Sequence, residues 1–83
     1  MSQNIEKEII SIISEVSGAD EVEIKLDSNL INDLEIDSIK AIEIAVAVEK
    51  KYKVSIRDED IPKIMTPRQI VELTQRLLTE ENK

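Results

Sequence analysis

Histidine and cysteine are both absent from this sequence of 83 residues. Without cysteine the chain can form no disulfide and no thiolate metal site. Without histidine it lacks the commonest general base and metal ligand of proteins, which excludes a Ser-His-Asp triad. We therefore expect no catalytic residue, no metal site and no enzymatic activity of the chain's own.

Aromatic residues are nearly absent as well: Tyr52 is the only one, and neither Phe nor Trp occurs. The core must therefore be aliphatic. Long apolar runs are also missing. The longest one in a helical context, residues 44–48, is far too short to span a membrane, and the first ten residues lack the pattern of a secretion signal. These features predict a cytoplasmic protein without membrane insertion.

Basic residues are fewer than acidic ones. The chain has 11 lysines and arginines against 18 aspartates and glutamates, which gives a formal net charge of -7. Repulsion between like charges makes nucleic acids and anionic membranes poor partners, whereas basic protein surfaces are favoured. The length corresponds to a single domain, residues 1–83, with a modest core.

What the sequence does contain is a series of amphipathic helical patterns. Apolar residues recur at every third or fourth position between residues 5 and 16, and Gly18 follows as a stop signal. A second helix is expected over residues 38–52. A third begins after Thr66, where Gln69 completes a capping box. Three longer helices are thus predicted.

Residues 19–37, between the first two predicted helices, show no helical pattern. Alternation at residues 22–26 is compatible with a strand, but no second strand exists to pair with it, so we expect an ordered loop. Its contacts with the core should come from Leu30, Ile31 and Leu34. Pro62 is compatible only with a first helical turn, so residues 58–63 form at most a short helix. The expected fold is therefore all-α: a small bundle of three longer helices plus one short helix, with a long loop between the first and second helices.

Ser38 stands at the start of the second expected helix, directly after Asp37. A serine at this position usually caps the helix, because its Oγ accepts a backbone N–H. A helix N-terminus also stabilises a phosphate through its free N–H groups and its dipole. A phosphoryl-linked group, attached to Ser38 by another enzyme, would suit this position and would need no base in this chain. The residues themselves leave both roles open.

The second expected helix carries more apolar surface than packing requires. Its apolar arc spans roughly 220°, whereas a surface helix needs only about 100°. Either the helix touches neighbours on several sides, or part of the arc docks a partner through Ile39, Ile42 and Val46. Residues 58–60 are simplest as first-turn acids of the short helix, and they lack the glycine and spacing of an EF-hand calcium loop. Residues 58–60 also extend a strip of acidic side chains around this surface. The strip consists of Glu35, Asp37, Glu43, Glu49, Asp58, Glu59 and Asp60.

From residue 34 to residue 73 the sequence, LEIDSIKAIEIAVAVEKKYKVSIRDEDIPKIMTPRQIVEL, resembles an acyl carrier protein. The likeness extends over essentially the whole chain and rests on an ordered series of features. An Asp-Ser-Leu-like motif opens the second helix, a glutamate follows five residues after the serine, and a glutamate and an aromatic residue come near the helix end. An extended link, an acidic short helix and a helix-opening threonine follow. In this sequence these features are Asp37, Ser38, Ile39, Glu43, Glu49, Tyr52, VSI, DEDIPKI and Thr66.

The resemblance implies that Ser38 carries a covalent 4′-phosphopantetheine, which a separate phosphopantetheinyl transferase transfers from coenzyme A. Asp37 and Ile39 complete the attachment motif. The thiol of this cofactor would hold acyl groups as thioesters, so the absence of cysteine is no obstacle. The implied function is to deliver acyl groups, without catalysis, to fatty-acid, lipid or polyketide biosynthetic enzymes with basic docking patches. A monomer is expected, and the sequence does not specify the acyl group.

The same resemblance implies a partner-binding surface centred on the second helix. Three departures favour a specialised carrier over a housekeeping one: Ile36 stands where Gly or Ala is frequent, Lys40 where carriers of fatty-acid synthesis often have a non-basic residue, and Tyr52 where Phe is usual. An aminoacyl or peptidyl carrier domain is an alternative, and a non-catalytic helical adaptor is another. The expected partner-binding residues are Glu35, Ile39, Lys40, Ile42, Glu43, Val46, Glu49, Asp58, Glu59 and Asp60.

Overall fold

The computed structural model describes the backbone of residues 2–81 and the side chains of residues 4–79. It contains three longer helices, α1 (Ser2–Ser17), α2 (Ser38–Tyr52) and α3 (Pro67–Glu81), and two short 3₁₀ helices, η1 (Glu21–Glu23) and η2 (Asp58–Lys63). No strand occurs in this part of the chain, which confirms the all-α prediction, although η1 was not expected. Within residues 2–81, no helix combines the length and the apolar character that crossing a membrane requires.

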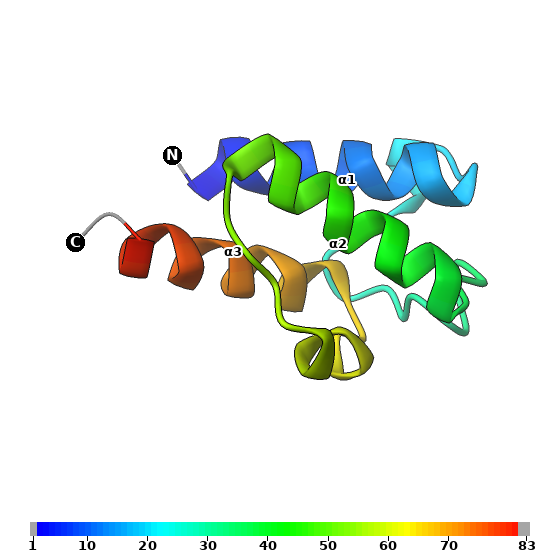
Figure 1. The fold of residues 1–83 in the computed structure, drawn as a ribbon. Coiled ribbons are helices and arrows are strands. Elements are labelled where there is room, and N and C mark those ends of the chain that lie inside the picture. Colours follow the sequence, from blue (N-terminus) through cyan, green and yellow to red (C-terminus); the bar gives the residue numbers. More distant parts are fainter. Residues whose placement is uncertain (1, 82–83) are drawn as a thin grey trace.

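The helices are arranged around α1, which packs against both α2 and α3, while η2 packs against α2 (Figure 1). The link from α2 to η2 crosses the molecule, so that η2 lies at the far side of α2 from α1 (Figure 1). The start of α1 and the end of α3 lie at the same end of the bundle. The opposite end is formed by the loop between α1 and α2 and by the first turn of α2.

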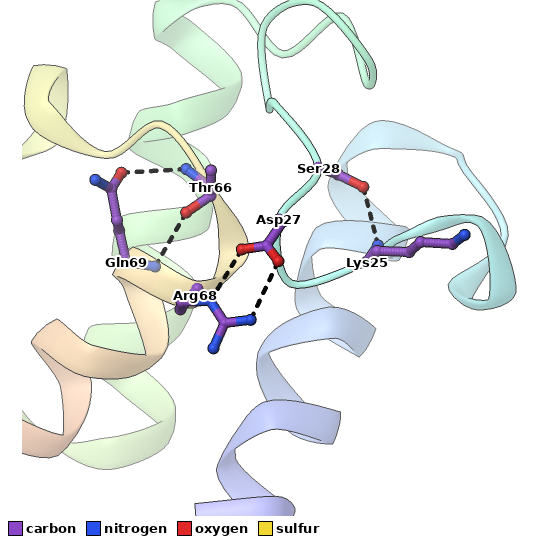
Figure 2. A network of polar contacts seen from close by, with 6 residues as sticks. All are labelled: Lys25, Asp27, Ser28, Thr66, Arg68 and Gln69. Atoms are coloured by element: carbon purple, nitrogen blue, oxygen red, sulfur yellow. Dashed lines mark hydrogen bonds and ion pairs between the residues drawn. The ribbon is translucent and has the colours of Figure 1, made fainter.

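Each longer helix has a defined start or end in the structure. Gly18 follows α1 with a φ of 82°, a left-handed conformation that glycine adopts without strain. Thr66 and Gln69 form the predicted capping box at the start of α3, because the Thr66 Oγ1 accepts the Gln69 N–H at 3.3 Å and the Gln69 Oε1 accepts the Thr66 N–H at 3.2 Å (Figure 2). Lys53 ends α2 in a left-handed conformation, with φ 57° and ψ 47°, and donates its N–H to the Glu49 carbonyl.

The core is aliphatic, as the composition predicts, and every longer helix contributes to it. Its fully buried side chains come from α1, α2, α3 and the loop, and include Ile9, Ile13, Ile36, Val48 and Ile70. Among these, Thr74 is a buried polar residue whose hydroxyl donates to the Ile70 carbonyl at 2.8 Å. Burial of these aliphatic side chains supplies the main stabilisation of the bundle.

The residues that connect the loop to the core differ in part from those expected. Leu30 is buried and Leu34 packs against the core, as predicted, but Ile31 is 56% exposed, so its predicted role was wrong. The reason is that Leu30 already points into the core, and its neighbour in the turn points outward. Ile36, which was noted only for its departure from the family pattern, is 2% exposed, so its side chain belongs to the core in place of that of Ile31.

The loop is ordered because the start of α3 holds it through main-chain hydrogen bonds. The Leu30 N–H donates to the Met65 carbonyl at 2.9 Å, and the Arg68 N–H donates to the Leu26 carbonyl at 3.0 Å. The Arg68 guanidinium also contacts the carboxylate of Asp27 (Figure 2). These contacts position the segment that leads into Ser38.

The short helix η2 accommodates a proline outside its first turn, contrary to the prediction. Pro62 is the fifth of its six residues. At its two ends, the Asp60 N–H donates to the Arg57 carbonyl at 3.0 Å and the Ile64 N–H donates to the Ile61 carbonyl at 3.1 Å. Neither bond needs an N–H from Pro62, so the proline causes no break.

The only aromatic side chain joins the end of α2 to α1. The Tyr52 hydroxyl donates a hydrogen bond to the Glu8 carboxylate, and the Lys51 Nζ lies 3.9 Å from the other oxygen of the same carboxylate. Partial burial and, next, the bond to Glu8 raise the pKa of the Tyr52 hydroxyl well above its ordinary value. The phenol is therefore neutral at any physiological pH.

Candidate functional site

Ser38 is the first residue of α2, and its side chain is exposed. It does not cap the helix: the cap is Asp37, whose Oδ1 accepts the Lys40 N–H at 2.9 Å. Among the described side chains, none forms a hydrogen bond with the Ser38 hydroxyl. The cap interpretation of Ser38 is therefore wrong, and its hydroxyl is available for another role.

The backbone that presents Ser38 is held on both sides. Before it, Glu35 adopts a left-handed conformation with a φ of 54°, and the Ile36 N–H donates to the Leu30 carbonyl at 2.9 Å. After it, the Asp37 carbonyl accepts the Ala41 N–H at 2.9 Å, as the first bond of α2. An L residue keeps a left-handed conformation only where surrounding contacts hold it there. Here those contacts fix the direction in which the Ser38 side chain leaves the bundle.

Beside Ser38 lies a groove of about 530 Å³ between α2, η2 and the loop. We call it the Ser38 groove. Asp37, Ser38 and Asp58 are the polar residues along it. The remaining walls are aliphatic, and they are formed chiefly by Leu30, Ile36, Ala41, Ile42, Ile61 and Ile64. A groove with this lining suits an apolar chain, whereas it offers no cationic side chain to pair with an anion.

The surface of α2 has an exposed apolar face next to this groove. Ile39, Ile42 and Val46 are 67%, 49% and 40% exposed. Neighbours within the bundle therefore do not account for the surplus apolar arc of α2, which favours the docking-face interpretation. Glu43 is exposed on the same helix.

The expected acidic residues divide into exposed ones and ones engaged within the chain. Glu49 is only partly exposed, and its Oε2 accepts the Ile56 N–H at 2.7 Å, which fixes the extended link after α2. Glu59 lies 3.5 Å from the Arg57 guanidinium, on the outside of η2. Asp60 is partly buried, whereas Asp58 is exposed at the edge of the Ser38 groove. The free acidic surface nearest to Ser38 is therefore smaller than the sequence indicated.

Metal ligands do not gather near Ser38. Among the residues that the structure describes, no group of three or more His, Cys, Asp or Glu side chains could hold a metal ion. Lys40, the basic departure next to the attachment motif, is partly exposed in the first turn of α2. The site thus consists of a free hydroxyl, a helix N-terminus and an apolar groove.

Comparison with known proteins shows which family this chain resembles. A family model described as "Phosphopantetheine attachment site" matches residues 7–74. An acyl carrier protein of Rhodococcus erythropolis is 38% identical over 78 residues, which cover 94% of this chain and 86% of that protein. A meromycolate extension acyl carrier protein of Mycolicibacterium aurum is 40% identical over 80 residues, which cover 96% of this chain and 81% of that protein.

A longer relative shows the limits of the match. The meromycolate extension acyl carrier protein of Mycobacterium tuberculosis is 43% identical over 74 residues, which cover 89% of this chain. The match covers 64% of that relative, so this chain spans less than two thirds of its length. The family match itself includes α2, η2 and most of α1 and α3, that is, every element around Ser38.

Proposed function

Because this chain belongs to the acyl carrier protein family, whose members carry acyl groups as thioesters on 4′-phosphopantetheine, we propose that Ser38 is its attachment site. The observation that supports this most is the free Ser38 hydroxyl, exposed at the N-terminus of α2 while Asp37 takes the cap. The cofactor supplies the thiol that holds the acyl group, so the chain itself needs no cysteine.

The first turn of α2 fits a phosphodiester. The first N–H groups of a helix have no partner within the helix, and here Asp37 satisfies the one of Lys40. Those of Ser38 and Ile39 belong to the same first turn, where free N–H groups and the helix dipole favour negative charge. The Ser38 Oγ forms the new bond to phosphorus, and adenosine 3′,5′-bisphosphate leaves from coenzyme A. The transferase catalyses this step and supplies the base that takes the hydroxyl proton, so this chain needs no histidine.

The Ser38 groove supports a fatty acyl cargo over an aminoacyl one. Its walls are aliphatic, and each methylene that leaves water for such a site gains about 0.8 kcal/mol before the cost of displacing side chains. An aminoacyl group would bring a charged amine into a site that gains little from it. The relatives named for meromycolate extension favour a specialised lipid pathway for this carrier too.

The carrier works with acyl-handling enzymes and with a transferase, and we propose where they dock. The exposed apolar residues Ile39, Ile42 and Val46 form the centre of the docking face, and Glu43 and Asp58 supply negative charge beside it. Partners with basic patches would be attracted by this charge and would then bury the apolar centre. Glu49 contributes indirectly, since it holds the link between α2 and η2.

The test is loading of the apo protein with coenzyme A, magnesium and a broad-range phosphopantetheinyl transferase. We expect the intact mass to rise by one phosphopantetheine, and Ser38→Ala to abolish the increase. Ser28→Ala, which changes a serine of the loop that precedes α2, is the matched control and should load normally. Loading of Ser38→Ala at a different serine would overturn the assignment.

A further inference from the structure

Ile36 forms part of the inner wall of the Ser38 groove. It lies two residues before Ser38 and lines the groove, yet its own side chain is among the largest that are fully buried, with 2% exposure. It therefore lies between the groove and the core. A side chain in this position limits how far anything in the groove can extend inward.

The backbone of Ile36 is held too firmly for the side chain to withdraw. Its N–H donates to the Leu30 carbonyl at 2.9 Å, and the Leu30 N–H in turn donates to the Met65 carbonyl at 2.9 Å, just before α3. The left-handed Glu35 precedes it, and Asp37, the cap of α2, follows it. The wall at Ile36 is thus held by hydrogen bonds that lead through Leu30 to the segment before α3, and it is joined through Asp37 to the start of α2.

The opposite wall is less firmly held. It is formed by Ile61, Pro62 and Ile64, which belong to η2 or follow it directly, and none of these three side chains is fully buried. A 3₁₀ helix has poorer hydrogen-bond geometry than an α-helix, and Pro62 has no N–H to contribute to η2. Displacement of this wall can widen the groove, but it cannot deepen it past Ile36.

We propose that Ile36 is a specificity-determining residue, whose bulk sets the length of the acyl chain that the Ser38 groove shelters. This inference rests on the proposed function, in which the cargo is a fatty acyl group on Ser38. An acyl chain shorter than the limit gains burial with every methylene. Beyond the limit, further methylenes stay in water and add nothing.

The experiment compares wild type, Ile36→Ala and Ile36→Val, each loaded on Ser38 with saturated acyl groups that lengthen in two-carbon steps. The folding equilibrium constant of each acyl form is measured by urea unfolding and divided by that of the thiol form of the same variant. In wild type this ratio should rise by about fourfold with each added methylene and then level off. Since Ile36→Ala removes three side-chain carbons, its plateau should move to chains that are two to three carbons longer. Ile36→Val should move it by about one.

Ile9→Ala and Ile9→Val are the matched controls, because Ile9 is fully buried in α1 and does not line the groove. They should lower the stability of all forms and leave the plateau where it is. If Ile36→Ala does not fold, the pair Ile36→Val and Ile9→Val still decides. An unchanged plateau in the Ile36 variants, an equal shift in the Ile9 variants, or no dependence on chain length in loaded wild type would overturn the role of Ile36. Failure of wild type to gain any mass at Ser38 would instead overturn the proposed function.

Discussion

Arg68 holds both carboxylate oxygens of Asp27, a loop residue 41 positions earlier in the chain (Figure 2). Its Nε lies 3.0 Å from one oxygen, and a terminal nitrogen lies 3.2 Å from the other. The same residue donates its backbone N–H to the Leu26 carbonyl. One residue of α3 therefore fastens the loop through its main chain and its side chain, and the bidentate geometry favours a single orientation.

This pair predicts a pH-dependent contribution to stability. The hydrogen bond to Arg68 and, next, its charge hold the pKa of the Asp27 carboxyl below its ordinary value of 3.8. The folded state thus binds this proton less readily than the unfolded state. The stabilisation is present above about pH 3.8 and is lost as the pH falls through the lower folded pKa. We expect Asp27→Asn to be slightly less stable than wild type at pH 7 and to equal it in strong acid.

Urea unfolding at neutral and acidic pH measures this difference. Because both side chains are well exposed, the effect should be small and should shrink as salt is added. Asp20→Asn is the matched control, since the Asp20 side chain makes no cap hydrogen bond. A loss in Asp20→Asn as large as that in Asp27→Asn would show that removal of any carboxylate from this segment, and not loss of the pair, is responsible.

The cap of α2 predicts unequal effects of two neighbouring substitutions. Asp37→Ala removes the side chain that accepts the Lys40 N–H and should cost about 1 kcal/mol of stability. Ser38→Ala removes an exposed hydroxyl without a partner and should change stability by less than about 0.5 kcal/mol. Denaturant unfolding of both apo variants checks the order. A larger loss in Ser38→Ala would mean that Ser38 has a structural role after all.

The left-handed end of α2 predicts a stabilising substitution. Lys53 has a φ of 57°, where an L residue is strained and glycine is not, so Lys53→Gly should add about 0.5–1 kcal/mol of stability. Lys50→Gly, three residues earlier within the same helix, should lose about 1 kcal/mol, because glycine weakens a helix interior. The two variants have the same change in charge. Thermal unfolding that moved in the same direction for both would contradict this reading of the helix end.

Lys40 predicts slow use of this carrier by generic fatty-acid enzymes. It places a positive charge in the first turn of α2, near Ser38 and three residues before Glu43, and so weakens the negative field that would attract basic partners. Lys40→Asp should therefore speed loading or acyl transfer severalfold at low salt, mainly through the association rate. The gain should shrink as salt rises, since salt screens charges between the two surfaces.

Initial rates at low and high salt test this expectation. Lys7→Asp is the control, because it makes the same change in net charge on α1. Equal acceleration by both variants would assign the effect to net charge. Equal rates for Lys40→Asp and wild type at low salt would remove steering as the reason to regard this carrier as specialised.

The sequence predicted features whose causes are local. The capping box of Thr66 and Gln69 and the stop at Gly18 depend on a few neighbouring residues, and the structure confirms them. The start of α2 was predicted correctly, but the cap was assigned to Ser38, whereas the preceding residue, Asp37, caps the helix. Asp37 and Ser38 both have side chains that can cap, and only the backbone conformation of Asp37 decides between them.

Features that depend on distant contacts were not predictable in the same way. In the loop, Ile31 and Ile36 are chemically alike, and only the turn held by Leu30 decides which one faces the core. Glu49 looked like a surface acid because its partner, the Ile56 N–H, belongs to a link without regular structure. Spacing along a helix shows which residues share a face, but it does not show what lies opposite.

Tyr52 gives this molecule a built-in optical probe. It is the single aromatic residue of the chain, so all near-ultraviolet emission of the polypeptide arises at one place, the contact between α2 and α1. A carboxylate that accepts a hydrogen bond from a phenol quenches its fluorescence, and here that carboxylate is Glu8. Separation of the two helices would therefore brighten the protein, whether cargo, partner or heat drives them apart. Tyr52→Phe would give a dark background, and the opening of the bundle could be followed in real time without any attached dye.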